Sequence, residues 1–341
     1  MPREHMTTTV VLLNWNGWKD TIECLESVFR LDGPVVRVVV CDNASVDGSL
    51  ERIKQWANGE LHARSENPEL AYLVSPSVEK PVAYRELTRD EAESQCANID
   101  DRLVLIQNGE NLGFAGGCNV GLRFALSDSQ CRYFWLLNND TVVEPGALSA
   151  MVRLMQQQTA VGICGSLNIS YHSPKQVQAQ GGKVYGRWTG RVQKFKALTV
   201  EQLNSVPAAM DFINGASMLV ARDFLEVVGL MDESYFLYFE ELDWAMRGKG
   251  RFTLGYSPQS VVYHKEGASI GSHPDRRRRS QISDAYLSRN RVLFTRRFFP
   301  WAVPTVVLSV IFAAVYHMFR GDIRRAKAMV QYMLRGLVAK A

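Results

Sequence analysis

The chain has 341 residues, of which 46% are hydrophobic and 22% are charged, and its net charge is +4. This length and composition allow a substantial buried core and about two domains. The six cysteines form no CxxC pair and lie mostly in apolar segments, so we expect free core thiols in a reducing compartment and no disulfide framework. The amino-terminal apolar stretch is too short for a signal peptide.

Two β-branched, apolar runs near the amino terminus each stop at polar residues. They are residues 7–13, followed by the polar turn at 14–17, and residues 35–41, followed by Asp42 and Asn43. A helical pattern follows each run, at 22–29 and at about 50–56, which predicts two buried strands with a helix after each. An acid at a strand tip, such as Asp42, is able to bind a nucleobase or ribose hydroxyl, although short polar residues also cap helices.

Residues 58–102 contain three prolines, many charges and little apolar periodicity. We interpret them as an insertion, with a loop and a short helix at 88–97. Surface decoration is favoured over a cover for a bound ligand.

A glycine-rich segment, NLGFAGGCNVG, occupies residues 111–121 and leads into a helix expected at 122–125. Glycines let the backbone approach a ligand closely, and a helix amino terminus favours a phosphate group. The segment matches neither the Walker A pattern nor the strict dinucleotide fingerprint, so by itself it is weak evidence for nucleotide binding.

The run YFWLLNNDT at 133–141 predicts a buried strand that ends in Asn138, Asn139 and Asp140. Ligands bind α/β sheets at the carboxyl ends of strands, and one carboxylate with substrate phosphates suits a hard cation such as magnesium. The alternative is an Asx-type turn without a ligand.

Three carboxylates, Glu240, Glu241 and Asp243, lie among aromatic residues at 236–244. Apolar surroundings raise a carboxyl pKa and make the group a usable general base, whereas the alternative is a solvated helix face. Residues 171–210, which precede this region and are rich in Gly, Lys and Gln, are expected to form a mobile segment.

Taken in order, six segments resemble the family-2 glycosyltransferases with a GT-A fold, and most closely the rhamnosyltransferase-like branch that uses nucleotide-diphosphate sugars. The segments are LLNWNG at 12–17, CDNASVDGS at 41–49, NLGFAGGCNVG at 111–121, LLNNDT at 136–141, INGASMLVARDFLEVVGLMDESYFLYFEELDWAMR at 213–247 and YHKEGAS at 263–269. The resemblance covers about residues 7–270. It implies an α/β fold, a mixed sheet flanked by helices, with a donor-binding half at about 1–145 and an acceptor half at about 146–270.

The resemblance also implies roles for individual residues. Glu241 would be the general base, and Asp140 and His264 would bind Mg²⁺ or Mn²⁺. The residues implied to line the nucleotide-sugar site are Asn14, Asn16, Asp42, Asn43, Gly113, Phe114, Asn119, Asn138, Asn139 and Asp140. Transfer would invert the anomeric carbon in one displacement, because no second nucleophile is needed.

Two positions depart from the family pattern. Asn138 stands where the metal motif has an acid, so metal binding would depend more on Asp140, His264 and the phosphates. Glu241 stands where the family usually has Asp, and one extra methylene shifts the carboxylate enough to affect the rate. Glu240 or Asp243 could therefore take the role of base.

The carboxyl-terminal part, residues 271–341, is basic and apolar. Residues 276–341 hold 14 Lys and Arg against two Asp, a net charge of +12, which leaves −8 for residues 1–275. The basic end includes four arginines at 276–279, and an apolar stretch at 298–319 is long enough to cross a bilayer if fully helical, but prolines interrupt it.

A further helical face in this part comprises Ile323, Ala326, Val330, Met333 and Leu337. We interpret the region as a helix pair lying on the membrane surface. The alternative is a hairpin packed on the catalytic domain or on a second subunit, as in a homodimer. Nucleic acid is a poor partner, because the acidic catalytic part would repel phosphates.

The sequence thus predicts an inverting glycosyltransferase at the cytoplasmic face of the membrane, acting in cell-surface polysaccharide synthesis. L-rhamnose from dTDP-rhamnose is the favoured donor, with a UDP-hexose or UDP-galactofuranose as alternatives, and the acceptor is a saccharide on a lipid carrier. Two other classes stay open: a sugar-phosphate nucleotidyltransferase, whose glycine-rich basic signature is absent from the first strand, and an inactive membrane-bound scaffold.

Overall fold

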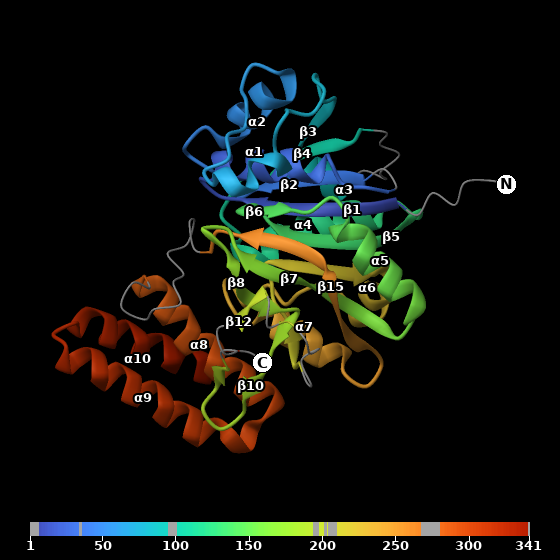
Figure 1. Cartoon of the computed structure of the whole chain (residues 1–341). Helices are drawn as coiled ribbons and strands as arrows, with labels where there is room; N and C mark the ends of the chain where they lie inside the picture. Colours follow the sequence, from blue (N-terminus) through green and yellow to red (C-terminus); the bar gives the residue numbers. More distant parts are fainter. Residues whose placement is uncertain are drawn as a thin grey trace.

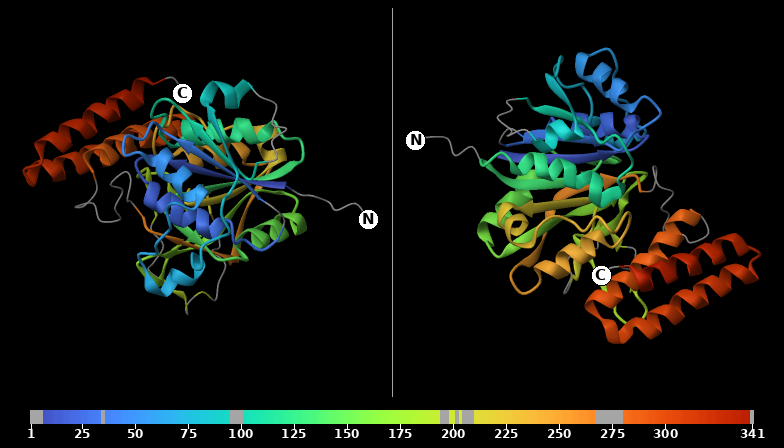
Figure 2. Two further views of the ribbon diagram at one scale, coloured as in Figure 1. Left: turned by 90° about the horizontal axis from the view of Figure 1, so that it is seen from above. Right: turned by 180° about the vertical axis from the view of Figure 1, so that it is seen from behind.

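A computed structural model describes residues 7–33, 36–94, 101–193, 198–200, 203, 210–266 and 280–339. Within them, a twisted sheet carries helices on both faces, and a group of carboxyl-terminal helices projects from one side of the sheet domain (Figures 1 and 2). The four arginines at 276–279 and Cys96 lie outside the described residues.

The main sheet has 11 strands in the order β12-β8-β7-β14-β5-β1-β2-β4-β3, with β15 pairing β7 and β6. Its strands are β1 (Thr7–Asn14), β2 (Val36–Asp42), β3 (Tyr84–Thr88), β4 (Leu103–Gln107), β5 (Cys131–Asn138), β6 (Thr141–Val143), β7 (Val161–Ser170), β8 (Ser173–Gln180), β12 (Leu198–Thr199), β14 (Ser217–Ala221) and β15 (Thr253–His264). Strands β3, β4, β2, β1 and β5 run parallel, whereas β14 is antiparallel to both of its neighbours. Parallel neighbours bring their carboxyl ends to one edge, where Asn14, Asp42 and Asn138 lie.

Two small two-stranded sheets accompany the main one: β9 (Gly182–Lys183) with β13 (Phe212–Ile213), and β10 (Tyr185–Gly186) with β11 (Arg191–Val192). The helices of the described chain are α1 (Trp18–Val28), α2 (Ser49–Asn58), η1 (Pro68–Leu73), α3 (Arg89–Ser94), α4 (Gly113–Leu126), α5 (Ala147–Gln157), α6 (Arg222–Val228), α7 (Glu240–Gly248), α8 (Gln281–Phe298), η3 (Pro300–Ala302), α9 (Val303–Phe319) and α10 (Ile323–Val338).

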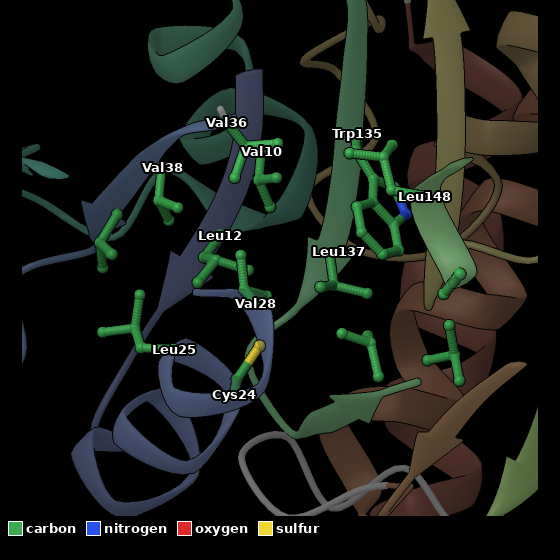
Figure 3. Packing of buried hydrophobic residues seen from close by; sticks show 14 of the residues in the cluster. Val10, Leu12, Cys24, Leu25, Val28, Val36, Val38, Trp135, Leu137 and Leu148 are labelled. Carbon is green, nitrogen blue, oxygen red and sulfur yellow. The ribbon is translucent and has the colours of Figure 1, made fainter. Parts of the chain in front are cut away.

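The core consists of two layers, one on each face of the sheet. Successive strand residues point to opposite faces, so Val10 and Leu12 of β1 pack against α1, α2 and α5, as Figure 3 shows for part of this layer. Val11, between them, packs on the other layer with α4, α6 and α7. Because both faces are covered, these parallel strands consist of continuous apolar runs, and this is why the sequence located β1, β2 and β5. The five described cysteines are buried and free, as expected.

The structure corrects two sequence predictions. Helix α4 begins at Gly113, not at 122, so the glycine-rich segment is mostly helix. The expected mobile segment at 171–210 forms strands β8 to β11 over residues 173–192. Within residues 58–102, the short helix expected at 88–97 is confirmed as α3, Arg89–Ser94, and residues 84–88 form an edge strand, β3.

Close packing of α4 on the sheet explains the glycines inside it. A Cβ on Gly117 would lie 2.4 Å from Leu13 Cδ1, and one on Gly121 would lie 2.7 Å from Val11 Cγ1. Glycine within a helix costs roughly 1 kcal/mol relative to alanine, and here it permits the helix to approach β1 closely. Position 113 favours glycine for a different reason, because its φ is +72° and a Cβ there would collide with the Phe236 carbonyl.

Helix α8 packs against the sheet domain. Phe294 joins an aromatic cluster with Tyr185 and Phe239, and Arg297 binds Asp232 and Asp243 at 2.8 Å. The next helix, α9, has 17 residues, and Pro304 lies in its first turn, where proline is tolerated. Helix α10 packs along α9 and α8 through Ala326 and Met333 and other residues of its predicted face, although Ile323 is 52% exposed.

An unusual backbone precedes α7. Tyr238 and Phe239 have φ values of 70° and 77°, which are costly for residues other than glycine. The buried Asn290 of α8 donates its amide to the carbonyls of Leu237 and Tyr238, at 2.8 and 2.9 Å. Helix α8 therefore holds the turn from which Glu240 and Glu241 project.

Replacing Asn290 by alanine should remove the hydrogen bonds to the Leu237 and Tyr238 carbonyls and lower the free energy of unfolding by about 2 kcal/mol. Urea unfolding monitored by circular dichroism measures this loss. Gln331→Ala, on the exposed side of α10, is the control and should change stability little. Equal stability of Asn290→Ala and the control would contradict the role of Asn290.

Candidate functional site

The site is centred on a carboxylate and an imidazole at the edge of the sheet. Asp140 follows β5, and His264 ends β15, which pairs antiparallel with β6 so that His264 lies opposite Thr141. Asp140 Oδ1 lies 3.2 Å from His264 Nε2, and the Asn138 amide nitrogen lies 3.4 Å from the same ring nitrogen. On its other side, His264 Nδ1 lies 3.2 Å from Gln178 Oε1 of β8. The ring is thus fixed from both sides.

Burial and charge set the protonation of this pair. Asp140 is 6% exposed and His264 is 9% exposed. Burial raises the pKa of Asp140, but His264, a backbone hydrogen bond and Lys265 together lower it more, so the pKa of Asp140 falls below its ordinary value. Burial lowers the pKa of His264, but Asp140 and Glu266 together raise it more. The pair therefore favours an ionised carboxylate, which is the form that binds a cation.

Lys265, a buried lysine that the sequence analysis did not single out, also contacts Asp140. Lys265 donates its backbone N–H to the Asp140 carbonyl, at 3.0 Å. Its ammonium lies 2.6 Å from Asp20, 2.7 Å from Glu23 and 3.6 Å from Glu66, and 4.8 Å from the centre of the Tyr171 ring. Burial lowers the pKa of Lys265, but Asp20 and Glu23 raise it more, so the ammonium stays charged. The only sequence signal was its position next to His264.

The tips of β1 and β2 form a connected polar group. Asn14 donates to Asp42 at 2.6 Å, and Asp42 also accepts from the backbone and hydroxyl of Ser45, at 2.9 and 2.6 Å. Asn16, with a φ of 52°, accepts from Val46 N–H at 2.8 Å. Both oxygens of Asp42 thus have partners within the protein, and its exposed fraction is 2%.

Asn139 links this group to the Asp140 region. Its amide nitrogen lies 2.9 Å from Thr21 Oγ1 and 3.4 Å from Asn14 Oδ1. The tips of β1, β2 and β5 are therefore one contiguous hydrogen-bonded edge.

The amino terminus of α4 lies beside the tip of β2. Asn43 donates its amide to the Gly113 carbonyl at 3.0 Å, and Phe114 N–H donates to the Phe236 carbonyl at 2.8 Å. Asn119 is placed differently, because it is 1% exposed and its amide binds Met231 and Glu233, which fixes α4 to residues 231–233. No contact among the described residues joins Asn119 to Asp140.

The three acids of α7 differ in their surroundings. Asp243 is fully buried and lies 2.7 Å from Arg247 and 2.8 Å from Arg297, so it is committed to a structural network. Glu240 is 3% exposed, and its Oε2 has no hydrogen-bond partner among the described residues. Burial and then the neighbouring Glu241 raise the pKa of Glu240 well above its ordinary value. Burial also raises the pKa of Glu241, which remains only partly covered.

Glu241 reaches the same neighbourhood through the segment before β14. A Cβ on Gly215 would lie 2.8 Å from Glu241 Oε1, and the next residue, Ala216, accepts the Asn138 N–H at 3.0 Å. Glu241 and Asn138 therefore contact adjacent residues of one short segment. Separate parts of the chain thus bring the expected base to the segment that binds Asn138, which in turn contacts His264.

A divalent cation fits the donor atoms at this edge, although the described residues contain no group of three or more His, Cys, Asp or Glu that could hold a metal ion. Asp140 offers an ionised carboxylate and His264 an imidazole nitrogen, 3.2 Å apart. Mg²⁺ is commonly held by one or two carboxylates together with substrate phosphates, and Mn²⁺ also accepts imidazole. Asp140 and His264 would therefore supply part of a coordination shell that a diphosphate would complete.

The family model described as Glycosyl transferase family 2 matches residues 9–77 and 84–224, which contain the tips of β1, β2 and β5. The chain belongs to glycosyl transferase family 2. The glycosyltransferase is similar to the low-salt glycan biosynthesis hexosyltransferase Agl10 of Haloferax volcanii, at 25% identity over 62% of this chain and 66% of the relative.

It is also similar to the N-acetylglucosaminyl-diphospho-decaprenol L-rhamnosyltransferase of Mycobacterium tuberculosis, at 27% identity over 50% of this chain and 61% of the relative. The match to each of these two relatives spans less than two thirds of that relative's length.

Solved structures confirm the GT-A fold. The mannosyltransferase PcManGT from Pyrobaculum calidifontis, in complex with GDP-Man and Mn²⁺, matches 98% of this chain and 88% of its own, at a TM-score of 0.51 and 14% identity. GalNAc-T7 with UDP, GalNAc and Mn²⁺ matches 85% of this chain and 51% of its own, at a TM-score of 0.51 and 14% identity. The mixed sheet flanked by helices is therefore the fold that the sequence predicted.

Glu240→Gln should stabilise the protein more as the pH rises. The pKa of Glu240 is raised from 4.5 in the folded state, so its contribution to stability is full below about pH 4.5 and is lost as the pH rises toward the folded-state pKa. Glutamine does not ionise, so the variant does not lose this stability as the pH rises. The advantage of the variant should grow by up to about 1.4 kcal/mol per pH unit.

Urea unfolding at about pH 5, 6.5 and 8 measures this difference. The exposed Glu60→Gln is the control and should show a flat difference. If the difference in free energy of unfolding between Glu240→Gln and the wild type did not change with pH, the pKa of Glu240 would not be raised in the folded state.

Proposed function

We propose that this protein is an inverting glycosyltransferase that moves a sugar from a nucleoside-diphosphate donor to a saccharide or lipid-linked acceptor. The observation that carries the proposal is the contact of Asp140 with His264 at 3.2 Å, at the strand edge of a family 2 chain. His264 and Asn138, which are 126 residues apart in the sequence, also meet there. This arrangement fits a metal-bridged diphosphate at the ends of the strands better than it fits a purely structural role.

The favoured donor is dTDP-L-rhamnose. Support comes from the relative named as an L-rhamnosyltransferase, which is 27% identical over half of this chain. A UDP-hexose and UDP-galactofuranose are the alternative donors, and the relative named as a hexosyltransferase supports a hexose without naming its nucleotide. The former relative's name describes a sugar on a diphospho-polyprenol, which supports a lipid-linked saccharide as the acceptor and a role in cell-surface polysaccharide synthesis.

The residues at the site support a single displacement. Glu241 accepts the proton of the acceptor hydroxyl, whose oxygen forms a bond to the anomeric carbon as the bond from that carbon to the diphosphate oxygen breaks. Burial raises the pKa of Glu241, which makes it a stronger base than an exposed glutamate. Asp140 and His264 would hold a divalent cation, and such a cation would supply positive charge that neutralises the departing diphosphate. The carboxyl-terminal edge formed by Asn14, Asp42 and Asn43 borders the nucleoside.

Asp140→Asn and Glu241→Gln should separate cation binding from proton transfer. Asp140→Asn should lose metal-dependent turnover by about 100-fold or more, because the ionised oxygen is gone. Glu241→Gln should keep donor affinity while transfer falls by about 10²–10⁴-fold. Release of nucleoside diphosphate from a panel of nucleotide sugars with Mg²⁺ or Mn²⁺, with and without acceptor, measures both.

Glu60→Gln serves as the control for both variants. Full transfer by Glu241→Gln would refute the assignment of the base. Pyrophosphate production from a sugar phosphate and a nucleoside triphosphate would instead indicate a nucleotidyltransferase, and donor binding without turnover would indicate a scaffold.

The carboxyl-terminal helices support a location at the inner face of the cytoplasmic membrane. Along α9, exposed apolar residues recur on one stripe, where Phe312 is 70% exposed and Phe319 is 88% exposed. Trp301, which begins this region, stacks edge to face on Trp188 at 4.7 Å, and both rings are largely exposed. Exposed tryptophans and an apolar stripe beside many arginines are typical of a surface that lies in the headgroup region of an anionic bilayer.

For α9, a position in the membrane plane is favoured over a membrane-spanning position. Pro300–Phe319 is the one described helical stretch that is long and apolar enough to span. Its neighbour α10 lies along it and exposes Arg324, Lys327 and Arg335. A spanning α9 would draw these charges into hydrocarbon, at roughly 2.5–3.5 kcal/mol each.

Replacing Phe312 and Phe319 together by serine should weaken binding to vesicles of phosphatidylglycerol and phosphatidylcholine by about 10-fold or more, since each ring loses roughly 1.5 kcal/mol or more of burial. Cosedimentation measures the partition coefficient. Val227→Ser removes an apolar side chain that is 48% exposed on α6 and is the control. Unchanged binding, together with dimer formation in ultracentrifugation, would instead assign this stripe to a subunit interface.

A further inference from the structure

Gln178 of β8 makes two hydrogen bonds to a single residue, His264. Its amide nitrogen donates to the His264 carbonyl at 3.0 Å, and its Oε1 lies 3.2 Å from Nδ1 of the ring. Strand β7 pairs with both β8 and β15, so Gln178 and His264 belong to strands that are not neighbours in the sheet. The side chain of Gln178 therefore reaches past β7, which ends at Ser170, opposite His264.

Strand β8 is irregular at the residue that makes this contact. Asn168 of β7 lies opposite Ala179, but its neighbour Ile169 lies opposite Val177, so Gln178 is an extra residue in the ladder. A bulge of this kind turns a side chain out of the regular alternation, and bulges are over-represented next to active sites. The bulge in β8 thus falls at the residue whose side chain binds the imidazole.

The two bonds determine which nitrogen of the neutral His264 ring carries the proton. The amide nitrogen of Gln178 is used by the carbonyl, so its Oε1 faces Nδ1, and an amide oxygen only accepts hydrogen bonds. Nδ1 therefore carries the hydrogen and donates it to Gln178. The other ring nitrogen, Nε2, keeps its lone pair, because a neutral imidazole has one N–H.

The lone pair of Nε2 faces the Asp140 carboxylate, whose Oδ1 lies 3.2 Å away. Two acceptors at this separation attract each other only through a positive charge that both of them bind. A histidine that binds a metal usually donates its second ring N–H to another protein group, which fixes the tautomer and the orientation of the ring. The contact between Gln178 and His264 has this arrangement.

We propose that Gln178 is a positioning residue for the cation site: it holds His264 in the tautomer that carries the proton on Nδ1 and so presents Nε2 to a divalent cation. This role rests on the glycosyl transfer proposed above, in which Asp140 and His264 bind that cation. Gln178 is not itself a ligand, because both ends of its amide bind His264. Its effect on the cation acts through the imidazole.

Gln178→Met and Gln178→Glu in the full chain separate the parts of this role. Methionine has a similar length but removes both hydrogen bonds, whereas glutamate keeps an oxygen that accepts the Nδ1 hydrogen. Gln176→Met is the matched control, because Gln176 is an exposed glutamine on the same strand. Electron paramagnetic resonance of free Mn²⁺ measures Mn²⁺ affinity, for the protein alone and with UDP or dTDP.

The tautomer is measured without any metal. Nitrogen-15 NMR of histidine-labelled protein, at a pH at which the ring is neutral, distinguishes a protonated ring nitrogen from one with a lone pair. The His264→Gln variant identifies the signals of this ring. In the wild type, the proton should be on Nδ1, and in Gln178→Met it should be shared between the two nitrogens.

Gln178→Met should weaken Mn²⁺ binding by about 10-fold or more, which is the usual effect of losing the partner that orients a histidine ligand. Gln178→Glu should recover most of this affinity, and Gln176→Met should bind Mn²⁺ as the wild type does. A role in packing alone would predict the same loss in the methionine and glutamate variants.

Unchanged Mn²⁺ affinity in a folded Gln178→Met protein, an equal loss in Gln178→Glu, or a proton on Nε2 of the wild-type ring would each overturn the positioning role. The last of these measurements requires only the wild type and His264→Gln, so it decides the matter even if Gln178→Met does not fold.

Mn²⁺ binding also keeps this role distinct from the proposed function, because it does not require sugar transfer. A wild-type protein that transfers no sugar, but whose Mn²⁺ affinity falls with Gln178→Met, would refute the transfer and leave the positioning role standing. A wild-type protein that transfers sugar but binds no Mn²⁺, alone or with either nucleotide, would refute the positioning role and leave the transfer standing.

Discussion

The pairing of β15 with β6 is the constraint on which the site depends. In this register, His264 lies opposite Thr141, so the imidazole meets the carboxylate of Asp140, which precedes β6 directly. A shift by one residue would turn the ring to the other face of the sheet. The register is reinforced on both sides, because Lys265 N–H binds the Asp140 carbonyl and Gln178 binds both the ring and the carbonyl of His264. A strand pairing thus fixes the geometry of a possible cation site.

Buried charge near this pairing is balanced by ion pairs that connect distant segments. Lys265 joins Asp20 and Glu23 of α1 and Glu66 of the segment at 58–102, and Tyr171 covers its ammonium. The segment at 58–102 is therefore more than a surface decoration, since it also provides an edge strand of the sheet. Removing one partner of such a network leaves an uncompensated charge, so these contacts hold the Asp140 region rigidly.

The acidic helix α7 depends on the carboxyl-terminal region in a similar way. Two residues with positive φ precede it, and Asn290 of α8 satisfies the carbonyls of this strained turn. Arg297 of the same helix binds Asp243, which explains why that acid is less suited than Glu241 to accept a proton. The helices that expose an apolar stripe are thus continuous with the one that positions the expected base. Binding of the stripe to a membrane would place the base and the acceptor site close to the lipid surface.

The sequence by itself determined the parallel strands and their polar tips, because strands buried on both faces require uninterrupted apolar runs that end where the backbone reaches the sheet edge. The resemblance of six ordered segments then predicted the GT-A fold and the candidate residues. The contacts of those residues were decided by the tertiary structure. Local patterns do not reveal that the glycines of α4 serve close packing on β1, or that Asn119 and Asp243 are committed to structural partners. Each of these depends on pairings between segments far apart in the chain, and only the packed sheet sets their register and distance.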